Sequence, residues 1–136
     1  MYDLDRFIIK QREMHSIVVD ELSAGHKRSH WMWYTFPQYV GVGESSMSYK
    51  YAIKSLEEAR AYLENEFLKS NIYELCNILL LSNKKAYDIF GSPDYKKLKS
   101  CMTLFDLVCP NDIFKAVLDK FYDGKYCSKT LSFCTN

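Results

Sequence analysis

The sequence predicts an all-α fold: a single small domain over residues 1–136, with about five to seven helices in orthogonal or bundle-like packing. Three observations support this fold class. Apolar residues recur three and four positions apart along most of the chain, capping residues stand where these stretches begin, and no stretch alternates as a strand would. A length of 136 residues suits one hydrophobic core.

The first predicted helix covers residues 3–24 and ends at Gly25. Gln11 falls in its apolar face, where the helical period calls for an apolar residue. Because a buried amide needs hydrogen-bond partners, Gln11 either braces a neighbouring loop or faces a cavity and binds a ligand there. The glycine- and serine-containing stretch 41–46 predicts a loop.

A second helical region begins at Ser55. Serine there and Glu58 three residues later form a capping box, in which each side chain accepts from the other residue's backbone N–H. Helical spacing continues to about Leu81, with an expected break near Asn65.

The C-terminal half contains further start and stop signals. Ser92, followed by proline and aspartate, predicts the N-cap of another helix, which the pair Cys109-Pro110 ends. Asn111 is expected to cap the next helix, which runs to Gly124. A short helix is expected from Ser128 onward.

Charge and composition restrict the partners. Eighteen basic and 17 acidic residues leave a net charge of +1, which does not support nucleic-acid binding. The longest apolar run, residues 78–81, is too short to span a membrane, and the first residues lack a signal-peptide pattern. Five cysteines without C-x-x-C spacing suit reduced thiols. We therefore expect a cytoplasmic protein without cofactor, while the sequence leaves the oligomeric state open.

Aromatic and polar side chains are concentrated in residues 27–38, a stretch with no clean helical or strand period. Aromatic rings there could stack on a planar ligand while serine and glutamine fix its orientation. The alternative is a core-forming loop whose rings are simply buried. The candidate ligand-binding residues in this stretch are Ser29, Trp31, Trp33, Tyr34 and Gln38.

His30 is the candidate catalytic residue, because histidine can exchange a proton near neutral pH. Together with His26 it offers only two ligands to a metal, without cysteines or acids nearby, so no metal site is expected.

Three further candidates follow Pro93. Lys97 could reach a phosphate if its helix borders a pocket, and otherwise belongs to a solvated face. Ser100 and Thr103 could bind a ligand, or could hydrogen-bond back to the preceding helical turn.

The chain resembles the uncharacterised bacterial family called domain of unknown function 1810. The resemblance covers nearly all 136 residues and implies a small, mostly α-helical domain without an established reaction. It is carried by the strings Asp3-Leu4-Asp5-Arg6-Phe7, Ser29-His30-Trp31-Met32-Trp33, Phe36-Pro37-Gln38, Gly41-Val42-Gly43 and Ile89-Phe90-Gly91-Ser92-Pro93-Asp94.

A partial resemblance gives a chemical expectation. Asp94-Tyr95, Lys97, Met102 and residues 118–121 resemble the second half of the NADAR (YbiA-like) superfamily, which is linked to ADP-ribose and other N-glycosidic nucleotide derivatives. The resemblance implies a small nucleotide-like or ADP-ribose-type ligand and N-glycoside hydrolysis. The superfamily's acidic residue before the histidine is absent here, so no catalytic carboxylate is implied.

Two other hypotheses are alternatives to the ligand-site hypothesis. The chain could be a non-catalytic helical module that binds a protein partner or sequesters a ligand, because tyrosine and tryptophan also anchor interfaces. Alternatively, the stretch from Ser29 to Gln38 could be a purely structural plug of the core.

Overall fold

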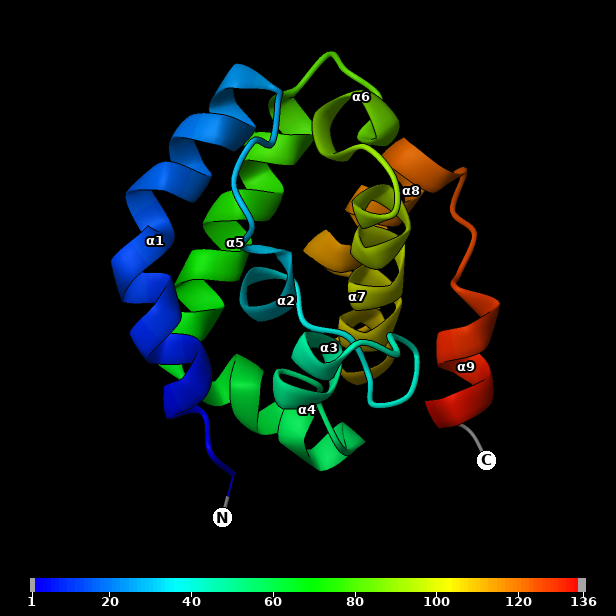
Figure 1. The fold of residues 1–136 in the computed structure, drawn as a ribbon. Helices are drawn as coiled ribbons and strands as arrows, with labels where there is room; N and C mark the ends of the chain where they lie inside the picture. Colours follow the sequence, from blue (N-terminus) through cyan, green and yellow to red (C-terminus); the bar gives the residue numbers. More distant parts are fainter. Residues whose placement is uncertain (1, 135–136) are drawn as a thin grey trace.

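The fold is known from a computed structural model, which describes residues 2–134 and confirms the all-α class. Nine helices follow one another along these residues (Figure 1). They exceed the expected five to seven because three of them contain only four or five residues. In chain order the helices are α1 (Asp5–Ala24), α2 (Met32–Thr35), α3 (Ser46–Lys50), α4 (Leu56–Glu64), α5 (Glu66–Leu81), α6 (Ala86–Phe90), α7 (Asp94–Val108), α8 (Ile113–Tyr122) and α9 (Ser128–Cys134).

The core is a single hydrophobic cluster shared by α1, α2 and α4 to α8. Helix α5 packs against α1 and α8, and α7 packs against α8 and α9. The short helix α2 lies between α1 and α7 (Figure 1). Along residues 2–134, β structure is limited to two isolated bridges that join residues 39 and 53 and residues 40 and 43. None of the described helices is long and apolar enough to cross a membrane.

Several predicted helix ends are confirmed. Gly25 closes α1 in the left-handed conformation with a φ of 74°, which a side chain would disfavour. Ser55 Oγ accepts from the Glu58 N–H at 3.0 Å, whereas the Glu58 carboxylate accepts from the Lys54 N–H, one residue before the expected partner. Asn65 breaks the following region and caps α5 by accepting from the N–H of residue 68.

Two predicted caps are wrong. Ser92 does not cap α7. As the cap, its hydroxyl would accept from the Tyr95 N–H, but that N–H donates to the backbone carbonyl of Gly91 at 2.8 Å. Asn111 does not cap α8 either. Its N–H donates to the buried Asp106, so the turn takes one more residue and Asp112 becomes the cap.

Candidate functional site

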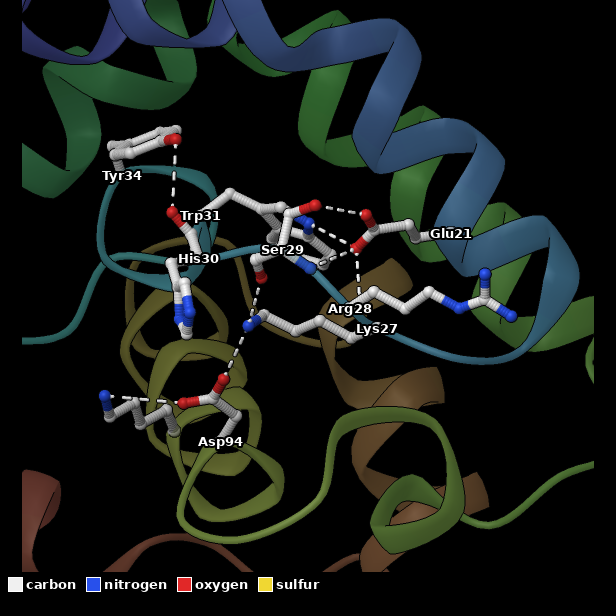
Figure 2. A network of polar contacts seen from close by, with 9 residues as sticks. Glu21, Lys27, Arg28, Ser29, His30, Trp31, Tyr34 and Asp94 are labelled. Carbon is white, nitrogen blue, oxygen red and sulfur yellow. Dashed lines mark hydrogen bonds and ion pairs between the residues drawn. The ribbon is translucent and has the colours of Figure 1, made fainter.

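The stretch 27–38, called here the aromatic segment, is anchored by one carboxylate from the last turn of α1. Glu21 Oε1 accepts from the Ser29 N–H at 3.0 Å and from the Trp31 indole N–H at 2.9 Å. It also accepts from the Arg28 N–H at 2.8 Å, and the Ser29 hydroxyl donates to Oε2 at 2.5 Å (Figure 2). Four donors therefore converge on Glu21 and fix where the segment leaves helix α1.

These bonds also determine the ionisation of Glu21. Desolvation by burial raises its pKa, but the hydrogen bonds from the Ser29 hydroxyl, the Ser29 and Arg28 backbones and the Trp31 indole outweigh it and hold the pKa at about 2. The carboxylate is thus charged at neutral pH.

The inner side of the aromatic segment belongs to the core. The Trp31 ring is fully buried between Phe36 and Phe90, with ring centroids 6.3 and 6.4 Å away. Tyr34 is buried against Tyr51 in an edge-to-face pair at 5.4 Å. For these rings the structure shows the core-forming alternative, and neither presents a free face for stacking on a ligand.

The outer side of the segment is accessible to solvent. His30 is exposed and Trp33 is half-buried, with the Lys97 ammonium 5.5 Å from the centre of its indole ring. In Figure 2 the His30 ring points to the side where Lys27 and Asp94 meet. We call Lys27, His30, Trp33, Asp94 and Lys97 the His30–Lys97 surface.

Asp94 joins the two lysines of this surface. Its carboxylate lies 2.9 Å from the Lys27 ammonium and 3.4 Å from that of Lys97. The Lys27 side chain is only 7% exposed, and it also donates to the carbonyl of Ser29 at 2.6 Å. Lys97 is more accessible, so of the two lysines it is the one that can exchange Asp94 for an arriving anion.

Gln11 of α1 braces the aromatic segment by hydrogen bonds. Its amide N–H₂ donates to the Tyr34 carbonyl at 2.8 Å and to the Tyr62 hydroxyl at 3.0 Å, while its carbonyl accepts from Asn71 at 3.1 Å. The cavity beside it has a volume of about 10 Å³, close to one water molecule. Gln11 thus takes the bracing role foreseen as one of its two alternatives.

Ser100 and Thr103 are occupied on the other side of α7. Ser100 shares a 2.8 Å hydrogen bond with Thr130 of α9. The Thr103 hydroxyl donates to the Lys99 carbonyl, as a helical hydroxyl can, and accepts from the Cys127 N–H. These bonds tie the C-terminal segment to α7.

Gln38 lies at the end of the aromatic segment, half-buried. Its backbone carbonyl accepts from the Ile53 N–H at 2.9 Å, and its side-chain oxygen lies beside Gly43. A Cβ on Gly43 would approach that oxygen to 2.9 Å and the Ser48 hydroxyl to 2.6 Å, so the absence of a side chain there lets the loop pack closely against both residues.

The structure therefore separates the predicted site residues into two groups. It brings His30, Trp33 and Lys97 to one surface, whereas Gln11, Ser100 and Thr103 are engaged elsewhere in internal bonds. The five cavities characterised among residues 2–134 are not lined by the three residues brought together. The same described residues contain no group of three or more His, Cys, Asp or Glu side chains placed to hold a metal ion.

Two residues of the site were missed by sequence reasoning. Glu21 had a detectable signal: an acid in the last turn of a helix opposes the helix dipole, so a compensating partner is expected. Asp94 entered the sequence analysis as the acid that follows Pro93 and as part of both family resemblances, but not as a site residue. Its pairing with Lys27, 67 positions earlier in the chain, could not be read from one sequence.

The comparisons with known proteins agree with this description. A model of the family described as "Protein of unknown function (DUF1810)" matches residues 1–134. The chain belongs to this family. The crystal structure of the conserved hypothetical protein Rv1873 from Mycobacterium tuberculosis is 40% identical and superimposes with a TM-score of 0.96, covering 99% of this chain and 98% of that one. No curated protein matches the chain significantly. The NADAR resemblance is not among these findings and stays a prediction.

Proposed function

We propose that the protein binds a small anionic ligand of the nucleotide or ADP-ribose type at the His30–Lys97 surface. The observation that carries the proposal is the placement of Lys97 over Trp33, beside an exposed histidine. A half-buried indole can stack on a base or ribose, and an ammonium held at its face can meet a phosphate.

The pair between Lys27 and Asp94 supports this use of the surface. Lys27 is almost completely buried and fixes Asp94 at 2.9 Å, so Asp94 stays in place when Lys97 turns to a ligand. A ribose hydroxyl could then donate to the freed carboxylate oxygen. The surface would therefore contact the base, a phosphate and a ribose hydroxyl of the ligand, which are the three parts of a nucleotide.

N-glycoside hydrolysis is the finer proposal for the same surface. The bond between ribose C1′ and the base would break with nicotinamide leaving as a neutral base, and Asp94 would stabilise the positive charge that develops on the ribose. Water would then attack C1′, and His30 would accept the proton that the water loses. The measurement is release of free base from NAD and related N-glycosides, with the His30→Ala variant expected to lose it.

A second candidate function is a non-catalytic module that sequesters the same ligand or binds a protein. It is favoured by the internal bonds of Gln11, Ser29, Ser100 and Thr103, which leave a surface with few free polar groups. Ligand binding without any release of free base supports this candidate over the hydrolase.

The direct test is calorimetric titration and thermal unfolding with ADP-ribose, NAD and AMP. At ten times the dissociation constant a specific ligand stabilises the fold by about 1.4 kcal/mol, which raises the melting temperature by roughly 5 °C. Trp33→Ala and Lys97→Ala should each abolish most of this shift.

Lys96→Ala is the matched control, because Lys96 is the exposed neighbour on the same helix and should retain the full shift. No stabilisation of the wild-type protein at millimolar ligand, or equal losses in the Lys96 and Lys97 variants, would contradict the proposal.

A further inference from the structure

A groove with a volume of about 540 Å³ lies between α6 and the end of α8. It is lined by residues 83–87, by Tyr95 and by residues 120–123. We call it the α6–α8 groove. It is the largest of the five characterised cavities, and its volume is in the range of small-ligand sites.

Aromatic rings form much of its lining. Tyr87 is 59% exposed and meets Tyr95 edge to face, with ring centroids 5.3 Å apart. Tyr95 is held in turn by the Tyr122 hydroxyl, which donates to its backbone carbonyl. The groove thus contains an accessible ring, that of Tyr87, packed against Tyr95, whose backbone carbonyl is held by a hydrogen bond.

Lysines surround these rings without carboxylate partners. Among the described residues, none of the five lysines around the groove forms an ion pair, unlike Lys27 and Lys97. Lys120 donates to the backbone carbonyls of residues 79, 80 and 82, and Lys84 donates to that of Gly25, so the partners of both are carbonyls and not carboxylates. Lys84, Lys85 and Lys120 line the groove. Lys96 and Lys99 lie beside it, over the rings of Tyr95 and Tyr122.

This local charge differs from the charge of the whole chain. The net charge is only +1, yet residues 82–99 contain five lysines against two aspartates. Lys97 and Asp94 pair with each other at the His30–Lys97 surface, which leaves four lysines of this stretch against Asp88. The end of α8 adds Lys120 and Asp123. The surface around the groove is therefore positive although the protein is nearly neutral.

We propose that the α6–α8 groove binds single-stranded nucleic acid, with a base stacked on Tyr87 and a phosphate at Lys85. Aromatic stacking requires an unpaired base, which excludes an intact duplex. The lysines favour a strand over a single nucleotide, because Lys96 and Lys99 continue along α7, each over a tyrosine ring, and offer more charge than one phosphate takes.

The experiment is fluorescence anisotropy with a labelled 12-nucleotide oligouridylate at about 50 mM salt and at higher salt concentrations. Tyr87→Ala is expected to weaken binding about tenfold. Lys85→Ala is expected to weaken it and to reduce the slope of log affinity against log salt by about 0.7. Both side chains are exposed, and circular dichroism verifies that the variants fold.

The matched controls lie near α3 and α4, at the opposite end of the molecule. Tyr49 is 49% exposed and Lys54 is an exposed lysine, and neither Tyr49→Ala nor Lys54→Ala should change the affinity more than twofold. Trp33→Ala should also bind the strand normally, so failure of this proposal and failure of the ADP-ribose proposal are distinguishable.

Four results would overturn the inference. They are no binding by the wild-type protein at low salt, equal losses in the control variants, tighter binding of a duplex of the same length, and saturable binding of uridine monophosphate without binding of the strand.

Discussion

The two sides of the aromatic segment use the same residue types in opposite ways. On the inner side, Ser29 and Trp31 direct their polar hydrogens to Glu21, and the Trp31 ring is completely buried. On the outer side, His30 is exposed and Trp33 carries a lysine over its ring. Neighbours in the sequence therefore differ in role because His30 and Trp33 reach the surface from a stretch that is otherwise mostly buried.

The comparison separates stability from binding. An inner residue is satisfied inside the protein, so its loss leaves a cavity or an unpaired buried group and lowers the free energy of unfolding. An outer residue has partners that solvent or a ligand can replace. Substitutions on the outer side should therefore leave the fold intact and change ligand binding.

The largest expected effect is that of Trp31→Ala. Removing the buried indole leaves a cavity beside Phe36 and Phe90 and takes one donor from Glu21, so we expect a loss of about 3–5 kcal/mol in unfolding free energy. Trp33→Ala, the matched outer change, removes a ring that is only partly buried against the core and should cost about half as much. Urea unfolding of both variants measures the difference, and similar costs would remove the distinction between the two sides.

The second effect concerns the acid between the two lysines. Asp94→Asn leaves the nearly buried Lys27 ammonium without its counter-charge and should cost about 2–3 kcal/mol. Lys97→Gln removes the more accessible pair and should cost roughly 0.5 kcal/mol. Chemical denaturation at pH 7 tests both variants. A larger loss for Lys97→Gln would show that Asp94 is held from the outer side instead.

The third effect is a pH dependence. Glu21 has its pKa lowered to about 2 from an ordinary value of 4.5, so its contribution to stability is complete above about pH 5 and is lost as the pH falls toward 2. After allowance for solvent screening, we expect this contribution to be about 1–2 kcal/mol.

Glu21→Gln should lack that part of the acid destabilisation, whereas Glu13→Gln, at an exposed position of the same helix, should keep it. Unfolding free energies measured between pH 2 and pH 7 give the comparison. If the unfolding free energies of the wild-type protein and Glu21→Gln changed with pH in the same way, the anchoring role of Glu21 would be contradicted.

The smallest effect on stability is expected for His30→Ala. His30 is exposed, and the recorded hydrogen bond at this residue is made by its backbone carbonyl, which accepts from the Tyr34 hydroxyl and survives the substitution. The melting temperature should change by about 2 °C or less, while the ADP-ribose response falls. A marked drop in melting temperature with an unchanged ligand response would favour the structural plug.

Most of the helical framework follows from local chemistry. The apolar spacing of α1, the Ser55 cap and the break at Asn65 depend on residues within one or two turns of each other, so the sequence predicts them. The misplaced caps at Ser92 and Asn111 depend on a choice between competing local bonds. The Asn111 N–H, for example, donates to Asp106 five residues earlier, and the sequence pattern does not show that this bond forms in place of the cap.

The candidate site was only half predictable because its contacts join residues that are distant in the sequence. The composition of the aromatic segment indicates its importance, but the sequence does not predict that the Lys97 ammonium lies over Trp33. Which rings are buried depends on Glu21 and on the entry of Phe90 from α6, both distant in sequence. Because the aromatic segment lacks a sequence periodicity, the sequence does not predict which of its side chains reach the surface.

The most direct test of the two-sided account uses the two indole N–H groups, the only ones in the chain. In a ¹H–¹⁵N correlation spectrum each tryptophan gives one indole resonance, which the Trp33→Ala variant assigns. Titration with ADP-ribose should move the Trp33 resonance and leave that of Trp31, bonded to Glu21, in place. A shift of the Trp31 resonance with Trp33 unmoved would contradict the account.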